Sequence, residues 1–521
     1  MGDTAKKRRG RMLPKVALTV AVATVMLGLL EVVVRRLDGY QVWTARLTPV
    51  ADRMSQMEEV APDLVEGFMA QPALRRGDVD GAWMLSSPEP PQRRPLPPEM
   101  QRVFDAGLHP MFLWQWNEAL LQSVWVKGAG PAVGEALQKP DAYYVFAPVE
   151  PTVFPRYRFP LSVTLPSGVT LNSIGFRGAD VAVDKPAATV RIACVGASTT
   201  VDDHQVLHSY PELLGHYLRC WASAHRPGLN FEVINAGCEG YSSTDIVQNV
   251  RHYVLPLEVD YVVYYEGANQ LHKTQVLQHV TIDGEVPPPP PMAGFLDPEA
   301  AATGENQWLY QRSAAARRLH TVFAGSSPAV EPSKPPQRVT LPEGIDEQRP
   351  DLARAAEILE LKTILPDLDA IRSDCAAAGA QLVLCSYKWL VYDGLALDPV
   401  RGEEVFRQLN RAFWPASYAS MRRLVDVQNR WFAAWAAARQ VPFLDVAACM
   451  PDDQRLHTDA IHKTQLGSRC HAWSTFCLLL PRLIADLDAG AVPTPDGQPS
   501  ARHPNVPPMR RKTAAEFDAE K

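Results

Sequence analysis

Residues 190–200 read Val-Arg-Ile-Ala-Cys-Val-Gly-Ala-Ser-Thr-Thr, and this stretch decides the fold. Its first six residues form an apolar run with one charge, Arg191, which is typical of a strand buried on both faces of a parallel sheet. A glycine, an alanine and three hydroxyl side chains follow, and a helix is predicted soon after. This order predicts the first strand and turn of a crossover unit.

Four more short apolar runs follow, separated by helical patterns. The predicted strands cover residues 231–234, 261–265, 381–385 and 442–446, and the predicted helices cover residues 210–224, 244–253, 351–378, 401–439 and 467–487. Strands that alternate with helices at this spacing form parallel sheets covered on both faces. The sequence therefore predicts a three-layer α/β/α domain around a central, five-stranded, mostly parallel sheet.

Composition limits the class of protein. The chain has 521 residues, which is more than one ordinary domain contains, because a hydrophobic core stops growing near roughly 250–300 residues. The hydrophobic share of 46% and the charged share of 21% exclude a wholly disordered or fibrous chain. A net charge of −6, from 52 basic and 58 acidic residues, gives no nucleic-acid signature. None of the eight cysteines forms a Cys-x-x-Cys pair, which argues against a zinc ribbon.

Proline marks the predicted boundaries, because 46 of the 521 residues are proline and such an excess indicates long loops and linkers. We predict an accessory region over 37–171, with a proline-rich linker near 86–98, and a main domain over 172–487. A proline-rich insertion, which includes five consecutive prolines, interrupts the main domain at 273–350, and residues 488–521 are predicted to be a disordered tail.

The N-terminus predicts a membrane anchor over residues 1–36. Six basic residues precede an apolar run at 16–34, whose length of about 28 Å as a helix matches a hydrocarbon core of about 30 Å. The charge bias places the N-terminus in the cytoplasm and the main domain outside, in a periplasmic or other extracytoplasmic position. A cleaved signal peptide and a buried core helix are the alternatives.

Ser198 is the candidate nucleophile. The preceding strand would place its hydroxyl at the carboxyl end of a central strand, where ligands bind in open α/β sheets. Backbone N–H groups at the start of the following helix are suited to stabilise an anion. A small residue followed by Ser-Thr after a strand is also a common helix cap, so this segment alone leaves both interpretations open.

Two further strand ends carry groups suited to an oxyanion. Residues 233–243 pass through a glycine-bearing turn at Gly237 and Gly240, where backbone amides can approach a reacting oxygen without side-chain obstruction. Residues 264–270 would place Asn269 at another strand's carboxyl end, with an amide that can donate to an oxyanion. Ordinary turns are the alternative interpretation of both segments.

The fourth segment, residues 456–463, reads Leu-His-Thr-Asp-Ala-Ile-His-Lys and precedes the last predicted helix. His462 is the candidate base, and Asp459 can hold its imidazole if the loop folds back on itself. His457 is expected at the surface or in a supporting position. Acyl transfer from a hydroxyl requires this set of groups: a nucleophile, a base, an orienting acid and oxyanion donors.

These four segments, in this order, resemble the SGNH, or GDSL-type, esterase/lipase superfamily. The matched motif positions are Gly196, Ala197 and Ser198 in the first block, Gly240 in the second, Gly267 and Asn269 in the third, and Asp459 and His462 in the last. Two positions depart from the family pattern, because Ala197 and Gln270 stand where aspartate is usual. Residues 172–178, Asn-Ser-Ile-Gly-Phe-Arg-Gly, look like the lead-in of membrane-anchored bacterial members.

The resemblance implies a flavodoxin-like sheet and a serine ester hydrolase that needs neither cofactor nor metal. It implies a triad of Ser198, Asp459 and His462, and an oxyanion hole built from the amides of Ser198 and Gly240 with the Asn269 side chain. Together with the predicted exterior position, it leads us to expect a small-molecule or polysaccharide acyl ester as substrate, such as an O-acetylated envelope or exported carbohydrate. No nucleic-acid partner is expected.

Two other functions remain open from the sequence. The same triad serves a polysaccharide O-acyltransferase, for which the insertion at 273–350 could exclude water as a lid. A catalytically silent envelope scaffold is the third candidate, and the intact set of Ser198, Asp459 and His462 argues against it.

Overall fold

The computed structural model of the protein describes part of the chain. The described residues are 3–37, 42–45, 61–95, 142–146, 159, 161–164, 169–202, 206–270, 281–282, 312–316, 318–319, 339–341, 343–355, 361–395, 397, 403–412, 416–494, 509–513, 515 and 519. Most of the predicted insertion at 273–350 and most of the aromatic-rich part of the accessory region lie outside these residues.

A five-stranded sheet forms the centre of the protein. Its strands are β4 (Thr189–Gly196), β5 (Asn230–Asn235), β6 (Tyr261–Tyr265), β9 (Gln381–Cys385) and β10 (Phe443–Leu444). They lie in the order β10-β9-β6-β4-β5, and every neighbouring pair is parallel. The predicted α/β fold is confirmed, and the strand order 2-1-3-4-5 is the flavodoxin-like one. Because all five strands run the same way, their carboxyl ends share one edge of the sheet.

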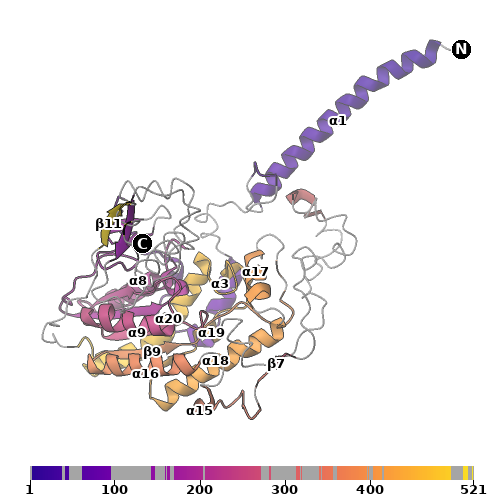
Figure 1. The fold of residues 1–521 in the computed structure, drawn as a ribbon. Coiled ribbons are helices and arrows are strands. Elements are labelled where there is room, and N and C mark those ends of the chain that lie inside the picture. The colour runs from indigo at the N-terminus through magenta and orange to yellow at the C-terminus, as the bar shows by residue number, and fades with distance from the viewer. Residues whose placement is uncertain are drawn as a thin grey trace.

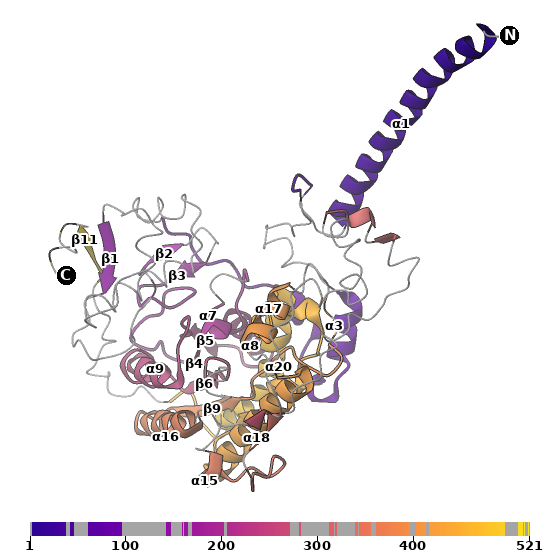
Figure 2. The same ribbon diagram turned by 45° about the vertical axis from the view of Figure 1, so that its right-hand side comes forward.

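Helices cover both faces of this sheet, as Figures 1 and 2 show. Helix α8 (Tyr210–His225) packs against α20 (Gln465–Asp488) on one face, and α9 (Ser243–Asn249) packs against α16 (Leu361–Ala377) on the other. All residues of β4 and β6 are buried, as the apolar runs predict for central strands.

The remaining helices and strands complete the described part of the chain. The helices are α1 (Asp3–Leu37), α3 (Pro62–Met69), α7 (Ser198–Val201), α15 (Leu352–Ala355), α17 (Glu403–Ala412), α18 (Tyr418–Ala438) and α19 (Val446–Cys449), with helical turns η1 (Pro72–Leu74), η2 (Gly81–Leu85), η3 (Val250–Val254), η4 (Leu255–Leu257) and η5 (Gln454–Leu456). The remaining strands are β1 (Ala142–Phe146), β2 (Val163–Thr164), β3 (Thr170–Leu171), β7 (Thr281–Ile282), β8 (Val339–Thr340) and β11 (Met509–Thr513).

Two predicted helices are interrupted, each at an identifiable residue. The pattern over 401–439 divides into α17 and α18, and α18 begins after its N-cap Ser417, whose side chain accepts a hydrogen bond from the Ser420 N–H. The helix predicted over 244–253 ends as α9 at Asn249 and continues as the turns η3 and η4. Pro256 lies in η4, and proline lacks the N–H that an α-helix requires.

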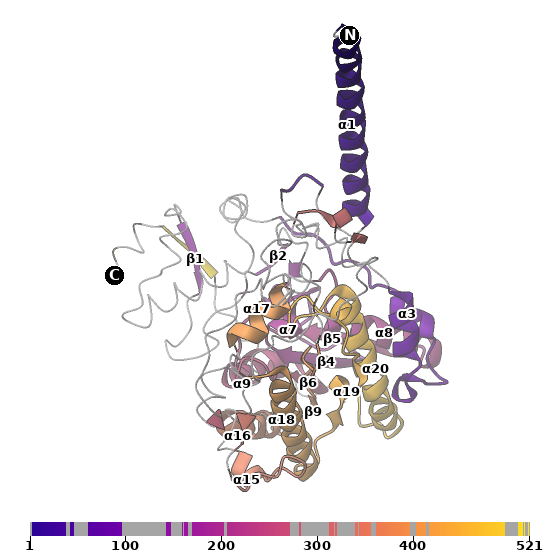
Figure 3. The same ribbon diagram turned by 90° about the vertical axis from the view of Figure 1, so that its right-hand side faces the viewer.

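Residues 61–95, predicted as part of a separate accessory region, pack into the main core. Leu64, Phe68, Leu74 and Met84 are buried in the same hydrophobic cluster as the central strands. Figure 3 shows α3 beside α20. The predicted linker also makes polar contacts here, because Arg469 of α20 donates to the Ser86 carbonyl at 2.6 Å.

Two short parts of the C-terminal region are among the described residues, and most of the predicted disordered tail lies outside them. Residues 489–494 continue along the core after α20, with Val492 buried. Strand β11 then pairs antiparallel with β1 of the accessory region.

Helix α1 extends away from the sheet (Figure 1). Within the described residues, no helix is both long and apolar enough to cross a membrane. The crossing predicted over residues 16–34 remains a prediction.

Candidate active site

Ser198 lies two residues past the end of β4, as the first residue of α7. Glycine is required at the last position of β4, because a Cβ at Gly196 would overlap the Tyr265 carbonyl oxygen on the neighbouring strand and the Thr200 hydroxyl. The N–H groups of Thr200 and Val201 both donate to the Ala197 carbonyl. The N–H groups of Ser198 and Thr199 precede these, in the part of a helix where donors have no intrahelical acceptor. This turn therefore presents a hydroxyl together with backbone donors at the carboxyl edge of the sheet.

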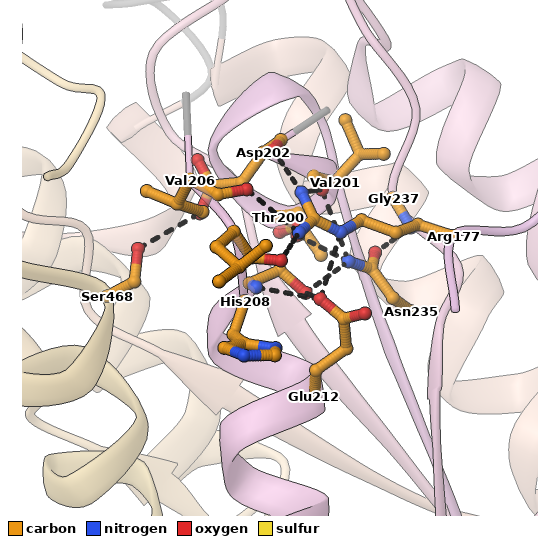
Figure 4. Close-up of polar contacts among 12 residues, drawn as sticks. Arg177, Thr200, Val201, Asp202, Val206, His208, Glu212, Asn235, Gly237 and Ser468 are labelled. Atoms are coloured by element: carbon orange, nitrogen blue, oxygen red, sulfur yellow. Dashed lines mark hydrogen bonds and ion pairs between the residues drawn. The ribbon is translucent and has the colours of Figure 1, made fainter. Parts of the chain in front are cut away.

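The chain that follows this turn is fixed by a buried guanidinium (Figure 4). Arg177 comes from the 172–178 segment that precedes the first strand, and it donates to the carbonyls of Val201, Val206 and Leu207 at 2.8–3.2 Å and to Glu212 at 2.9 Å. Such backbone carbonyls would be costly to bury without a donor. The hydrogen bonds from Arg177 therefore fix the backbone conformation of the segment that follows Ser198.

Asn235 braces the same turn from the end of β5. Its side-chain nitrogen donates to the Thr200 carbonyl and to the Ser209 hydroxyl, both at 2.9 Å, and its side-chain oxygen accepts from the Gly237 N–H at 3.1 Å. One carboxamide thus joins the first and second motif segments.

The loop that carries His462 folds back on itself. His457 and Lys463 pair as an antiparallel bridge, and the Thr458 N–H donates to the His462 carbonyl at 3.0 Å. The His462 Nδ1 lies 2.6 Å from Asp459 Oδ2, and the other carboxylate oxygen accepts the His462 N–H at 2.7 Å. The carboxylate therefore fixes both the backbone and the ring of His462.

This loop lies at the same edge of the sheet as Ser198. The Leu390 N–H, beyond β9, donates to the Ala460 carbonyl at 2.7 Å, and the Lys463 ammonium donates to the Tyr265 hydroxyl at the end of β6 at 3.0 Å. Tyr265 is the register partner of Gly196 on β4. Among the described residues, the Ser198 hydroxyl makes no hydrogen bond to the imidazole. Catalytic hydrogen bonds are commonly long in unliganded enzymes and shorten when substrate binds.

The two predicted side donors of an oxyanion hole lie on adjoining loops. Gly240 is exposed and adopts φ +68°, a conformation that favours glycine. The Asn269 side-chain nitrogen donates to the Tyr241 carbonyl at 2.8 Å. A carboxamide nitrogen carries two hydrogens, so this bond uses one donor and holds the amide beside Gly240.

Gln270, where the resemblance implies an aspartate, braces this loop on the start of α9. Its side-chain oxygen accepts the Ser243 N–H, and its nitrogen donates to the Ser243 hydroxyl, both at 2.9 Å. Glutamine thus provides the acceptor that an aspartate would provide and adds a donor.

The pKa values of two carboxyl groups at the site, Asp459 and Glu266, are shifted in opposite directions by hydrogen bonds and by burial. Burial by itself would raise the pKa of Asp459, but the charge and hydrogen bonds of His462 and the Ile461 N–H more than offset it and hold that pKa well below its ordinary value. Glu266 precedes the Asn269 loop, and burial raises its pKa to about 7, although it accepts the N–H groups of Ala268 and Asn269. Asp459 is therefore a carboxylate at neutral pH, whereas Glu266 changes charge there.

Three polar residues of this edge were not identified from the sequence. Glu266 and Lys463 lie inside the motif segments, next to Gly267 and His462. Tyr387 lies two residues past β9, where its hydroxyl donates to the Thr199 hydroxyl at 3.1 Å and its ring stacks on Tyr265 at 4.7 Å. A tyrosine just after a predicted central strand was the available signal for this position.

Of the two positions expected for His457, the structure shows the supporting one, because its side chain is buried. Burial holds the pKa of His457 well below its ordinary value, which favours the neutral ring. It stabilises the loop through its backbone pairing with Lys463.

Neither a metal centre nor a second ligand site emerges from the described residues. They contain no group of three or more His, Cys, Asp or Glu side chains that could hold a metal ion. A cavity of about 220 Å³ lies behind Tyr387, between α18 and the segment after β10. Two cations of its lining are paired: Arg422 with Asp426 of the same lining at 3.0 Å, and Lys388 with Asp452 outside it at 2.5 Å.

Comparisons with known proteins give distant structural similarities. No family model matches the chain, and no curated protein matches its sequence. Similar solved structures include a catalytic mutant of Axe2, an acetylxylan esterase from Geobacillus stearothermophilus, at 12% identity over 56% of this chain and 94% of that chain, with a TM-score of 0.29. They also include an alpha/beta hydrolase enzyme from the metagenome of Lake Arreo, at 14% identity over 56% and 96%, with a TM-score of 0.28.

A third similar structure is a GDSL-like lipase from Bacteroides thetaiotaomicron, at 12% identity over 57% of this chain and 88% of that chain, with a TM-score of 0.24. At such TM-scores the fold assignment depends on the sheet order described above, and the chemistry depends on the residues at the carboxyl edge.

Proposed function

We propose that this protein is a serine ester hydrolase in which Ser198 is the nucleophile, His462 the base and Asp459 the residue that orients the imidazole. The observation that carries the proposal is the 2.6 Å hydrogen bond between Asp459 and His462, on a self-closed loop at the strand edge where Ser198 begins a helix. This arrangement supplies an oriented base, a hydroxyl and backbone donors at one place, which is what acyl transfer requires.

In the proposed reaction, His462 Nε2 takes the Ser198 proton as the hydroxyl oxygen attacks the ester carbonyl. The Asp459 carboxylate holds the ring and stabilises the imidazolium that forms. The N–H groups of Ser198 and Gly240 and the Asn269 amide stabilise the oxyanion. The imidazolium then protonates the leaving alcohol, and water, activated by the same base, releases the acyl group.

The proposed substrate is an acyl ester of an envelope or exported carbohydrate, and the proposed location of the site is outside the membrane, with α1 as anchor. The location is supported by the apolar run at 16–34 and the basic residues before it. Exposed apolar side chains along α1 also support it: Val20, Val22, Val25, Met26, Leu27, Leu29, Leu30 and Val33.

Hydrolysis of aryl acetates and longer-chain aryl esters by the full chain tests the proposal. Ser198→Ala should remove hydrolysis, whereas Ser420→Ala, a serine of α18 that is 8% exposed against 7% for Ser198, should keep it. Equal hydrolysis by the Ser198 variant and the unaltered chain would contradict the assignment.

Acyl transfer to a sugar hydroxyl is the second candidate, and the low exposure of Ser198 favours it because transfer requires that water be excluded from the acyl-enzyme. Acetate release and acetylated-sugar formation, measured on the same acetylated donor with and without an acceptor oligosaccharide, separate the two reactions. A chain that does neither and does not react with a fluorophosphonate is the silent scaffold.

A further inference from the structure

Lys463 places a buried ammonium directly beside the candidate base. The residue is 1% exposed, and its Nζ donates to the Tyr265 hydroxyl at 3.0 Å. The same ammonium lies over the Tyr265 ring, 4.8 Å from its centroid, which adds a cation–π attraction. A desolvated ammonium is costly unless it is paired, so this contact determines where the residue can lie.

Charged and titratable groups from several elements face Lys463. The carboxylates are Asp202 at the end of α7, Asp459 of the same loop and Glu266 beyond β6, and the other groups are the Lys388 ammonium beyond β9 and the imidazoles of His457 and, on α20, His471. The three carboxylates favour the ammonium form and Lys388 opposes it. Lys463 is thus held between the turn of Ser198, the end of β6 and the start of α20.

The position of His462 depends on that of Lys463, because both residues belong to one hydrogen-bonded loop. The bridge between His457 and Lys463 closes the loop, and the next residue, Thr464, donates its N–H to the Leu456 carbonyl at 3.0 Å. Gly467 of α20 is closely covered by this loop, because a Cβ there would overlap the Leu456 carbonyl and lie 3.0 Å from Lys463 Cβ. A displacement of Lys463 therefore displaces His462.

We propose that Lys463 is a positioning residue for the proposed hydrolysis: its ammonium, held by the hydroxyl and ring of Tyr265, seats the His462 loop against the end of β6, beside the strand that leads to Ser198. The inference rests on the proposed function. It assigns a role to a residue that contacts neither the substrate nor the reacting atoms, and it requires the charged form of the side chain.

The charge requirement predicts a pH dependence. Burial lowers the pKa of Lys463 to about 8, against the opposing effect of the carboxylates. As pH rises through this value the ammonium loses its proton, and its attraction to the ring and to the carboxylates is lost. We expect kcat to fall reversibly above pH 8 while the chain remains folded.

The test measures kcat and KM for an aryl acetate from pH 6 to 10, with thermal unfolding as a folding check, on the full chain and three variants. Lys463→Met should lower kcat about 100-fold with KM changed less than about threefold, since a misplacement of about 1 Å costs on that order. Lys463→Arg should retain at least a tenth of the kcat of the unaltered chain. Its kcat should not fall above pH 8, because a guanidinium stays charged. Tyr265→Phe keeps the ring and should lower kcat about 10-fold through loss of the hydroxyl contact.

Lys185→Met is the matched control, because Lys185 is also a buried lysine, paired with Asp260 at 2.9 Å, but at the opposite edge of the sheet. It should lower the unfolding temperature and leave kcat unchanged. Folded Lys463→Met protein with unaltered kcat and an unaltered alkaline limb would overturn the inference while the proposed function stands. If Lys463→Met does not fold, wild-type kcat in Tyr265→Phe and an unshifted limb in Lys463→Arg would overturn it. Absence of hydrolysis by the unaltered chain would instead overturn the proposed function, and this inference with it.

Discussion

The two edges of the central sheet both bury charge, but they use it differently. At the amino edge, Asp260 immediately precedes β6, and its carboxylate accepts from the Arg191 N–H at 2.7 Å, from Lys185 at 2.9 Å and from the Thr494 N–H and hydroxyl at 2.9 and 2.8 Å. The four donors to this carboxylate come from three residues in different parts of the chain. Its contacts join two strands to the residues that follow the last helix.

At the carboxyl edge, burial shifts two of the charged groups toward neutrality, because it raises the pKa of Glu266 and lowers that of Lys463. Asp459 at the same edge is held in the charged form by His462. Groups with displaced pKa values in one cluster are typical of sites that do chemistry. Buried charge therefore keeps the fold together at the amino edge, whereas at the carboxyl edge the displaced pKa values of Glu266 and Lys463 mark the groups that lie around the proposed reaction.

The difference in function between the two edges is tested most strongly by removing one carboxylate from each edge. Asp459→Asn should lower kcat by about 10⁴-fold, because the amide cannot hold the imidazole in the tautomer that accepts the serine proton. Asp260→Asn should keep the kcat of the folded molecules. Steady-state kinetics with an aryl acetate checks both. A similar loss in the two variants would show that the edges do not differ in function.

A substitution at the amino edge should instead lower the free energy of unfolding. Lys185→Met leaves the Asp260 carboxylate buried without its cation, and unpairing a buried charge costs about 3–5 kcal/mol. Urea denaturation followed by circular dichroism measures the free energy of unfolding. A change below about 1 kcal/mol would contradict the structural role assigned to this pair.

The oxyanion donors give the next effect. Asn269→Ala should lower kcat by about 10²–10³-fold, the usual cost of losing one such donor. Asn230→Ala, at the amino end of β5, is the control at the other edge and should leave kcat unchanged. Full activity in the Asn269 variant would remove its side chain from the proposed oxyanion hole.

The smallest effect concerns pH and stability. Because burial raises the folded-state pKa of Glu266 to about 7, the folded protein binds this proton more tightly than the unfolded chain does. Its stabilising contribution is present below pH 4.5 and is lost as pH rises through about 7, a change of about 3 kcal/mol.

Glu266→Gln keeps an acceptor for the Ala268 and Asn269 N–H groups without titrating. The difference in unfolding free energy between the two proteins should therefore shift by about 3 kcal/mol between pH 4.5 and 8. A difference that stays constant across this range would contradict the shifted pKa.

The sequence predicts those parts of the fold that depend on local pattern. Short apolar runs, interrupted only by Arg191 in the first of them, identify β4, β6 and β9, and the Asp459-x-x-His462 spacing permits the folded-back loop that the structure shows. The catalytic roles of these residues remain proposals. The apolar side chains of residues 61–95 were visible in the sequence, but not the surface that buries them.

What the sequence does not predict depends on contacts between distant segments. Lys463 and Tyr265 are 198 residues apart, and Tyr387 reaches Thr199 across 188 residues. Such contacts are set by strand order and helix packing, which no local pattern encodes. His457 illustrates the same limit, because a polar residue in a loop is expected at the surface until the packing of the loop on α20 is known.

The most direct test of the central claim is the identity of the residue that reacts with a fluorophosphonate. We predict one adduct per chain, located by tandem mass spectrometry on Ser198 and absent from Ser198→Ala protein. An adduct on another residue, or a folded chain that does not react while a control serine hydrolase does, would contradict the account.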